Sequence, residues 1–209
     1  PTCRSRLAWS VGLMTFCVNN MAKKNLLYFN DTETSSGNIA TGQIITSAFI
    51  ITDANLNELA RYQAKINFQG APFLWELEAQ NVHKISLPTA MNHGAPLENY
   101  FHSIRAMNSE MVSKFGEHKA VFAAQNAFFD FGMHKTNERI AFGDQYRKTL
   151  IEEIFGYKPF DTSVLFAVAG NWNRSGLSNW VSKETEDSNK RHDALYDTEI
   201  LVDACRNHL

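Results

Sequence analysis

Three acidic groups in this chain of 209 residues have the residue types and the spacing for divalent-metal chemistry. In the first, Asp31-Thr32-Glu33-Thr34, two carboxylates stand two residues apart at the end of a predicted strand, where they point to the same side. Carboxylate pairs of this kind suit hard cations such as Mg²⁺ or Mn²⁺. Taken alone, the pattern is common, and a polar exit from a strand is its more ordinary explanation.

The other two groups fall at predicted helix starts. Asn126-Ala127-Phe128-Phe129-Asp130 leads into a helix that Asp130 could simply cap. In His192-Asp193-Ala194-Leu195-Tyr196-Asp197, five residues of helix would leave the first and last side chains about 140° apart. We therefore predict that His192 precedes the helix and that Asp197 lies inside it, on the floor of a site. For each group alone, a solvated or capped helix start is the simpler interpretation.

Hydrophobic patterning predicts the elements that must hold these groups. Segments 26–29, 43–52 and 62–68 have the composition of strands joined by short connections, which favours an antiparallel meander. Two later apolar runs, 119–125 and 158–161, add further strands. Helices are predicted at 75–85, 97–111, 130–141, 144–155, 162–169, 177–183 and 194–206. This order predicts an α/β fold in which helices flank a central mixed five-stranded sheet.

Composition bounds the class of protein. Apolar residues make up 44% of the chain and aromatic residues 12%, so a core can form without disulfides. The formal net charge of −2 excludes a strongly basic coat, although a local basic groove could still bind nucleic acid. Cys3, Cys17 and Cys205 match no zinc pattern and are odd in number, which indicates a reducing, cytoplasmic setting.

The first twenty residues differ from the rest. Residues 7–18 form an apolar run after two arginines, but no small-residue cleavage site follows, and Met21 opens a segment typical of a protein start. We interpret residues 1–20 as a non-native or disordered extension and residues 21–209 as a single domain. No apolar run approaches the roughly 20 residues of a membrane span, so no membrane association is predicted.

Taken together, the acidic groups resemble the three sequence motifs of the DEDDh 3′→5′ exonucleases, a DnaQ-like superfamily with a ribonuclease H-like fold. Motifs II and III are most similar to those of ribonuclease T, and residues 28–34 also resemble exonuclease I. Segment 78–85 resembles a stretch of the polymerase III proofreading subunit, except that Lys84 stands where glycine is usual. The resemblance covers about residues 25–209. The motif positions are Asp31, Glu33, Asp130, His192 and Asp197.

The resemblance implies a two-metal phosphodiester hydrolase that uses Mg²⁺ or Mn²⁺. It implies that Asp31, Glu33 and Asp197 hold one cation, with Asp31 bridging to a second. Asp130 would act largely through bound water, and His192 would be the general base. Nucleoside 5′-monophosphates would leave one at a time from the 3′ end of a single strand. The residues that would contact this strand are Thr34, Val82, His83, Asn126 and Phe129.

Several alternatives stay open at this point. DNA is the favoured substrate, and the alternative is a ribonuclease T-like or oligoribonuclease-like enzyme that trims RNA. A catalytically silent module that binds nucleic acid or a polymerase is a second alternative, which the intact acidic set disfavours. A homodimer and a polymerase or repair partner are both compatible with the sequence. Phe128 is predicted to be core and Asp161 a helix cap, and no ligand role is predicted for His93, His102, His118, His134 and His208.

Overall fold

The structure, a computed structural model, describes residues 25–143, 148–169, 177, 180, 190 and 192–208. The extension predicted over residues 1–20 and nearly all of the helix predicted over 177–183 lie outside these residues. Among the described helices, none has both the length and the apolar character needed to cross a membrane.

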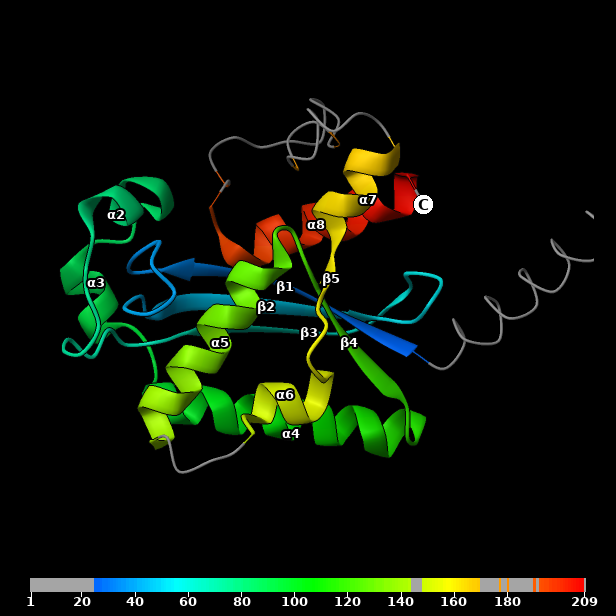
Figure 1. Cartoon of the computed structure of the whole chain (residues 1–209), viewed down its shortest axis with the longest axis horizontal. Helices are drawn as coiled ribbons and strands as arrows, with labels where there is room; N and C mark the ends of the chain where they lie inside the picture. The colour runs from blue at the N-terminus through cyan, green and yellow to red at the C-terminus, as the bar shows by residue number, and fades with distance from the viewer. Residues whose placement is uncertain are drawn as a thin grey trace, which may run out of the picture.

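A five-stranded sheet with the order β3-β2-β1-β4-β5 forms the centre of the fold (Figure 1). The central strand β1 (Asn25–Thr34) pairs antiparallel with β2 (Ile44–Thr52), which pairs antiparallel with β3 (Glu58–Lys65). On its other side, β1 pairs parallel with β4 (Lys119–Ala124), and β4 pairs parallel with β5 (Phe160–Asp161). The predicted mixed sheet, a meander extended by parallel strands, is therefore confirmed.

Helices cover both faces of this sheet. In Figure 1, α4 and α6 lie below the sheet, α5 crosses in front of it, and α7 and α8 lie above it, while α2 and α3 lie beyond one end of the strands. Two separate apolar cores result, one beneath α4, α5 and α6 and one beneath α7 and α8. The helix bounds are α2 (Leu77–His83), α3 (Leu87–Asn92), α4 (Leu97–Phe115), α5 (Ala127–Phe142), α6 (Leu150–Phe155), α7 (Thr162–Ala169) and α8 (Ala194–His208).

The two-residue period of β1 divides its side chains between these cores. Tyr28 is buried with the core of α4, α5 and α6, whereas Phe29 is buried with the core of α7 and α8. By the same alternation, Asp31 and Glu33 face α8, and Thr32 faces α5. The first acidic motif therefore supplies carboxylates to one layer of the protein and a hydroxyl to the other.

Several predicted boundaries differ from the structure. The third strand spans Glu58–Lys65 rather than 62–68, because the backbone after Ile66, which still donates to Ile45 on β2, bonds to the segment around Ala95 instead. Helix α5 begins three residues earlier than predicted, after the left-handed residue Asn126. Helix α6 is only six residues long and starts with a capping box at Thr149, whereas 144–147 lie outside the described residues. Helix α3 was not predicted.

Candidate active site

Three of the predicted site residues meet where β1 ends beneath the start of α8. Glu33, His192 and Asp197 each offer one ligand atom, and these atoms all lie within 4.8 Å of one another. We call these three residues the cation cluster. Glu33 and Asp197 are 7% and 9% exposed, and His192 is more accessible. Asp31 lies two residues before Glu33 on the same face of β1 and is half-buried.

The local backbone explains how His192 and Asp197 come together. Helix α8 starts at Ala194, so His192 lies outside the helix and Asp197 lies in its first turn, as the spacing predicted. His192 adopts a left-handed conformation with φ of 65°, which is uncommon for a residue with a side chain. In this conformation its backbone N–H donates to Asp197 Oδ2 over 3.0 Å. Asp197 therefore fixes the turn that carries the imidazole.

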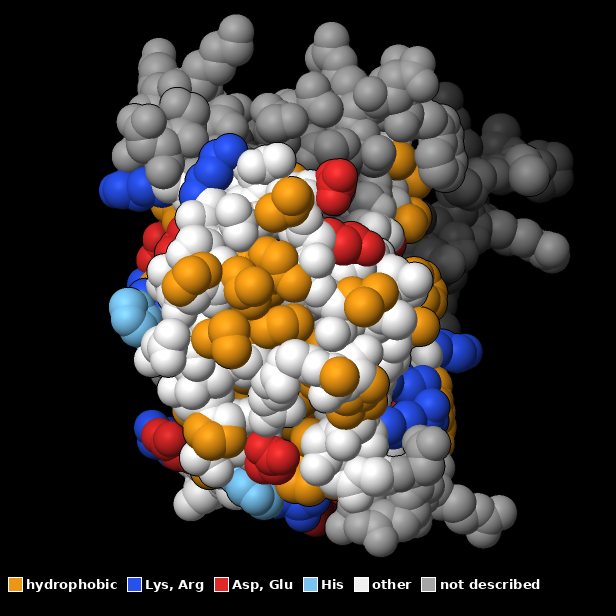
Figure 2. All heavy atoms as spheres, turned by 90° about the vertical axis from the view of Figure 1, so that its left-hand side faces the viewer, with side chains coloured by type: hydrophobic (Ala, Val, Ile, Leu, Met, Phe, Trp, Pro, Cys, Tyr) orange, Lys and Arg blue, Asp and Glu red, His pale blue; other side chains and the backbone are white. Residues whose placement is uncertain are grey.

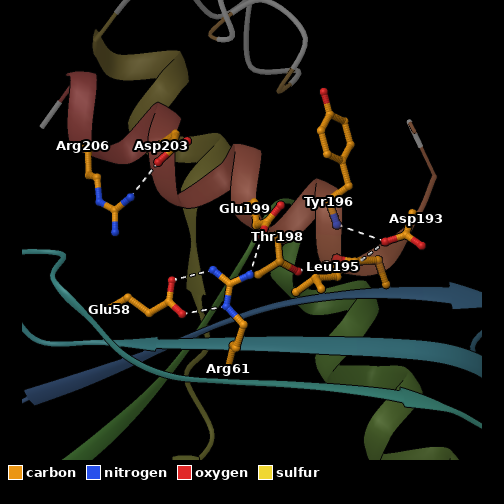
Figure 3. A network of polar contacts seen from close by, with 10 residues as sticks. Glu58, Arg61, Asp193, Leu195, Tyr196, Thr198, Glu199, Asp203 and Arg206 are labelled. Carbon is orange, nitrogen blue, oxygen red and sulfur yellow. Dashed lines mark hydrogen bonds and ion pairs between the residues drawn. The ribbon is translucent and has the colours of Figure 1, made fainter. Parts of the chain in front are cut away.

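Polar contacts hold α8 over the sheet (Figure 3). Asp193 starts the helix, since its Oδ1 accepts the backbone N–H groups of Leu195 and Tyr196, each over 3.1 Å. Arg61 on β3 pairs with Glu199 on α8 and with Glu58 on its own strand, over 2.5 and 2.7 Å. These exposed ion pairs contribute little stability individually, but they link β3 to the helix that carries Asp197.

Asp130 lies in the first turn of α5 and contacts Thr32, the residue between Asp31 and Glu33 on β1. Its carboxylate accepts a hydrogen bond from Thr32 Oγ1 over 2.6 Å, and the residue is 4% exposed. Burial raises the pKa of Asp130 to about 7, and the hydrogen bond from Thr32 opposes that shift only in part. A carboxyl in such a position gains from a nearby positive charge, because the charge would offset the desolvation of its ionised form.

The donor set of the cation cluster fits a divalent cation. Two carboxylates and one imidazole offer oxygen and nitrogen atoms, a combination that suits Mn²⁺ and its neighbours, and Asp31 adds a further carboxylate on the same strand face. Carboxylates this close to one another repel unless a positive charge lies between them. The residues present therefore fit the metal that the sequence resemblance implies, while the metal's identity is not fixed by them.

A groove of about 360 Å³, which we call the α2 groove, opens beside the cation cluster. Glu33 belongs to both the cation cluster and the α2 groove. Four of the five predicted strand-contacting residues line the groove, so side chains from β1, α2 and α5 that are distant in sequence share one surface. The lining is Thr32, Glu33, Thr34, Gly37, Glu76, Glu78, Ala79, Val82, His83 and Phe129. Its wall combines apolar groups with carboxylates.

Individual residues of the α2 groove differ in how they are held. Phe129 is half-buried and packs against the core of α4, α5 and α6, so its ring is fixed. Val82 is 45% exposed. The Thr34 hydroxyl donates to the Ser36 carbonyl over 2.9 Å, so it supports its own loop. His83 is buried, and burial lowers its pKa; the Thr34 backbone raises it, and nearby His192 lowers it.

Asn126 does not line the α2 groove. Its side chain makes no capping bond to α5 in the described structure, and its backbone N–H donates to Asp161 Oδ1 over 3.1 Å. The same Asp161 oxygen accepts the Ser163 backbone N–H over 2.9 Å, as expected of a helix cap. The predicted contact of Asn126 with a nucleic acid strand therefore remains a prediction.

A second groove, of about 530 Å³, is lined by His83 and His192 among others. It contains three lysines, Lys65, Lys84 and Lys190. The groove also contains two carboxylates, and both have partners: Asp193 accepts backbone N–H groups at the start of α8, and Glu199 pairs with Arg61. The cation cluster thus contributes Glu33 to a groove that is apolar and acidic and His192 to one that is basic.

Sequence reasoning missed two residues and misplaced a third. Thr32 was not singled out, although its place between two acids on a strand implies that it faces the other layer. His134 was given no role, although its spacing of four from Asp130 places both on one helix face. Phe128, predicted to be core, is 66% exposed, because the early start of α5 turns it to solvent and turns Phe129 inward.

Comparisons with known proteins give the fold. No protein-family description matches the chain, and no curated protein matches it in sequence. E. coli exonuclease I with a dT13 oligonucleotide matches with a TM-score of 0.70 and 17% identity over 88% of this chain. The zinc-bound complex of E. coli exonuclease I with single-stranded DNA matches with a TM-score of 0.69 and 16% identity over 88% of this chain. Exonuclease I of Methylocaldum szegediense matches with a TM-score of 0.60 and 20% identity over 87% of this chain.

These matches cover 40%, 40% and 39% of the solved chains, so this chain spans about two fifths of their length. The chain therefore has the fold of the matched part of exonuclease I, the fold that the sequence resemblance implied.

Proposed function

We propose that this protein is a metal-dependent 3′→5′ exonuclease that hydrolyses single-stranded nucleic acid, with DNA as the favoured substrate. The observation that carries the proposal is that Glu33 belongs both to the cation cluster and to the α2 groove. A phosphate held at the cluster would leave the nucleotide attached to it within reach of Val82 and Phe129. Exonuclease I structures with the same fold contain single-stranded DNA, which supports DNA as the substrate.

Each acidic side chain has a role in this proposal. Asp31, Glu33 and Asp197 would hold one divalent cation, and Asp31 together with Asp130 would hold a second, Asp130 through water. When bound, two such cations offset the charge of the phosphate and make a bound water more acidic. The requirement for cations follows from the charges, because acidic side chains alone would repel a phosphodiester.

His192 would act as the general base and would not itself bind the cation, because one ring nitrogen cannot hold both a metal ion and a proton. Its imidazole lies outside α8, on the accessible side of the cluster, and its backbone bond to Asp197 keeps it there. It would accept the proton of the attacking water as the water oxygen bonds to phosphorus and the bond from phosphorus to O3′ of the preceding nucleotide breaks. The products would be a nucleoside 5′-monophosphate and a strand shortened by one nucleotide, whose new 3′ oxygen takes a proton from solvent.

The α2 groove would hold the terminal nucleotide. The Phe129 ring offers a stacking face, which contributes about 1–3 kcal/mol per base in single-strand binding proteins. Val82 and Ala79 add apolar contact from α2. Stacking and apolar contacts accept any base, which agrees with an enzyme that degrades a strand one nucleotide after another.

The experiment compares end-labelled single-stranded DNA and RNA of the same sequence, incubated with the full chain and Mn²⁺ or with EDTA. We expect the 3′ label to appear as mononucleotide only with Mn²⁺, and the 5′ label to give a ladder. Asp197→Asn should abolish this release, whereas Asp203→Asn, the same change on an exposed position of α8, should not.

Three results would count against the proposal as stated. Faster cleavage of RNA than of DNA would move it to the ribonuclease T-like alternative. Oligonucleotide binding without cleavage in a folded protein that binds Mn²⁺ would favour the silent module. Equal activity of Asp197→Asn and the wild type would remove the cation cluster from the mechanism.

A further inference from the structure

A buried chain of polar contacts runs through the core of α4, α5 and α6 and ends at Asp130. Asn30 Nδ2 on β1 donates to Ser47 Oγ on β2 over 3.0 Å, and Ser47 Oγ lies 2.8 Å from the Tyr100 hydroxyl on α4. That hydroxyl lies 2.6 Å from His134 Nε2 on α5, and His134 Nδ1 lies 2.7 Å from the Asp130 carbonyl. All of these side chains are at most 1% exposed.

At the Asp130 end of the network, the chemistry of the groups determines which atom donates each hydrogen bond. A carbonyl oxygen can only accept, so His134 Nδ1 must carry the proton that faces Asp130. Nε2 of the neutral ring is then an acceptor, and the Tyr100 hydroxyl donates to it. Because that hydroxyl has a single proton, the Ser47 hydroxyl must be the donor in its own contact with Tyr100. Burial lowers the pKa of His134 to about 4, so the ring stays neutral and this tautomer persists at neutral pH.

Stability alone does not explain such a network. Polar groups in an apolar core are no more stabilising than well-packed apolar side chains of the same volume, but they fix geometry because each bond has a direction. Here the network joins two strands and two helices to a single residue. The Thr32 hydroxyl holds the Asp130 side chain from β1, so Asp130 is held at both its carboxylate and its backbone.

We propose that Tyr100 and His134 are positioning residues that hold Asp130 in place for the second cation. This inference rests on the proposed function, in which Asp130 serves that cation. Tyr100 does not line the α2 groove or the cation cluster, so it would act only through α5. Loss of its hydroxyl would leave His134 Nε2 without its donor and free the first turn of α5 to shift.

The test compares two tyrosine-to-phenylalanine variants of the full chain. Tyr100→Phe removes the network hydroxyl. Tyr28→Phe is the matched control, because Tyr28 is also fully buried in the same core and its hydroxyl donates to Asn108 over 3.1 Å, outside the network. Mn²⁺ binding is measured by calorimetric titration, and unfolding by urea with EDTA present.

We expect both variants to lose similar amounts of stability. Only Tyr100→Phe should raise the dissociation constant of the lower-affinity Mn²⁺ site, by about 10-fold, which is the usual effect of removing a partner that orients a metal ligand. The Mn²⁺ concentration for half-maximal nuclease rate should rise by the same factor. Ser47→Ala, a smaller change in the same network, should give a shift in the same direction and serves if Tyr100→Phe does not fold.

Equal Mn²⁺ affinity in Tyr100→Phe, Ser47→Ala and Tyr28→Phe would overturn the inference, as would a wild type that binds a single Mn²⁺. Failure of the proposed function gives a different pattern. In that case the wild type binds two Mn²⁺ ions but cleaves neither DNA nor RNA, and the titrations still decide whether the network positions Asp130.

Discussion

The closeness of Glu33 and Asp197 predicts that removing one charge makes the metal-free protein more stable. Asp197→Asn keeps the size of the side chain and an oxygen that can accept the His192 backbone N–H. It removes the negative charge beside Glu33. Asp197→Ala removes both the charge and the acceptor, so the two variants separate electrostatic repulsion from support of the turn.

The distances give the size of the effect. Two unit charges at most 4.8 Å apart repel by about 3 kcal/mol at an effective dielectric of about 20. The hydrogen bond from the His192 N–H weakens by about 1 kcal/mol when its acceptor becomes neutral. Asp197→Asn should therefore raise the free energy of unfolding of the metal-free protein by about 2 kcal/mol. Asp197→Ala loses the bond entirely and should be close to the wild type.

Urea unfolding at pH 8 measures these changes, first with EDTA and then with Mn²⁺. A ligand at 100 times its dissociation constant stabilises a protein by about 2.7 kcal/mol, and Asp197→Asn should lose most of that gain. Asp203→Asn, whose side chain is exposed and pairs with Arg206, should behave as the wild type in both conditions. If metal-free Asp197→Asn is less stable than the wild type, or gains as much from Mn²⁺, then the two carboxylates do not form a cation site.

Three further outcomes are expected. Phe129→Ala should raise KM for oligonucleotides by about 5- to 100-fold through lost stacking, whereas Phe128→Ala, which changes an exposed ring beside it, should not; steady-state kinetics decide. The folded-state pKa of His134, about 4, lies below its unfolded value of about 6.5, so its contribution to stability is complete above pH 6.5 and is lost as pH falls toward 4. The stability gap between wild type and His134→Gln should therefore narrow by roughly 3 kcal/mol over that range in urea titrations with EDTA. Burial raises the pKa of the Cys205 thiol to about 12, so peptide mass spectrometry should find residue 205 unlabelled by iodoacetamide at pH 8 unless urea is present.

The sequence was sufficient for the sheet and for the relation between His192 and Asp197. Strand alternation and the angular step of a helix are fixed by backbone geometry. Two acids two residues apart on a strand must therefore share a face. His192 and Asp197, five residues apart, could come together only if His192 preceded the helix. The apolar runs at β1, β2 and β4 are buried on both faces, which is why they were visible without knowledge of their neighbours.

Features set by tertiary contacts could not be predicted from local pattern. The end of β3 depends on backbone bonds to the segment around Ala95, thirty residues along the chain. The start of α5 depends on the left-handed conformation of Asn126 and its bond to Asp161. At this helix start Phe128, predicted to be core, is exposed, and Phe129 lines the α2 groove.

The alternation of β1 also explains why the site has two unlike halves. Asp31 and Glu33 face α8, where His192 is exposed and its backbone N–H donates to the buried Asp197 carboxylate. Thr32 faces α5, where Asp130 is buried and tied to the core. In the proposed mechanism, a strand that borders two cores thus keeps the general base accessible to solvent and the metal-binding carboxylate rigid within the same site. Because the rigid half depends on core packing and the accessible half on a surface turn, core substitutions should alter metal affinity, and changes near residue 192 should alter the proton-transfer step.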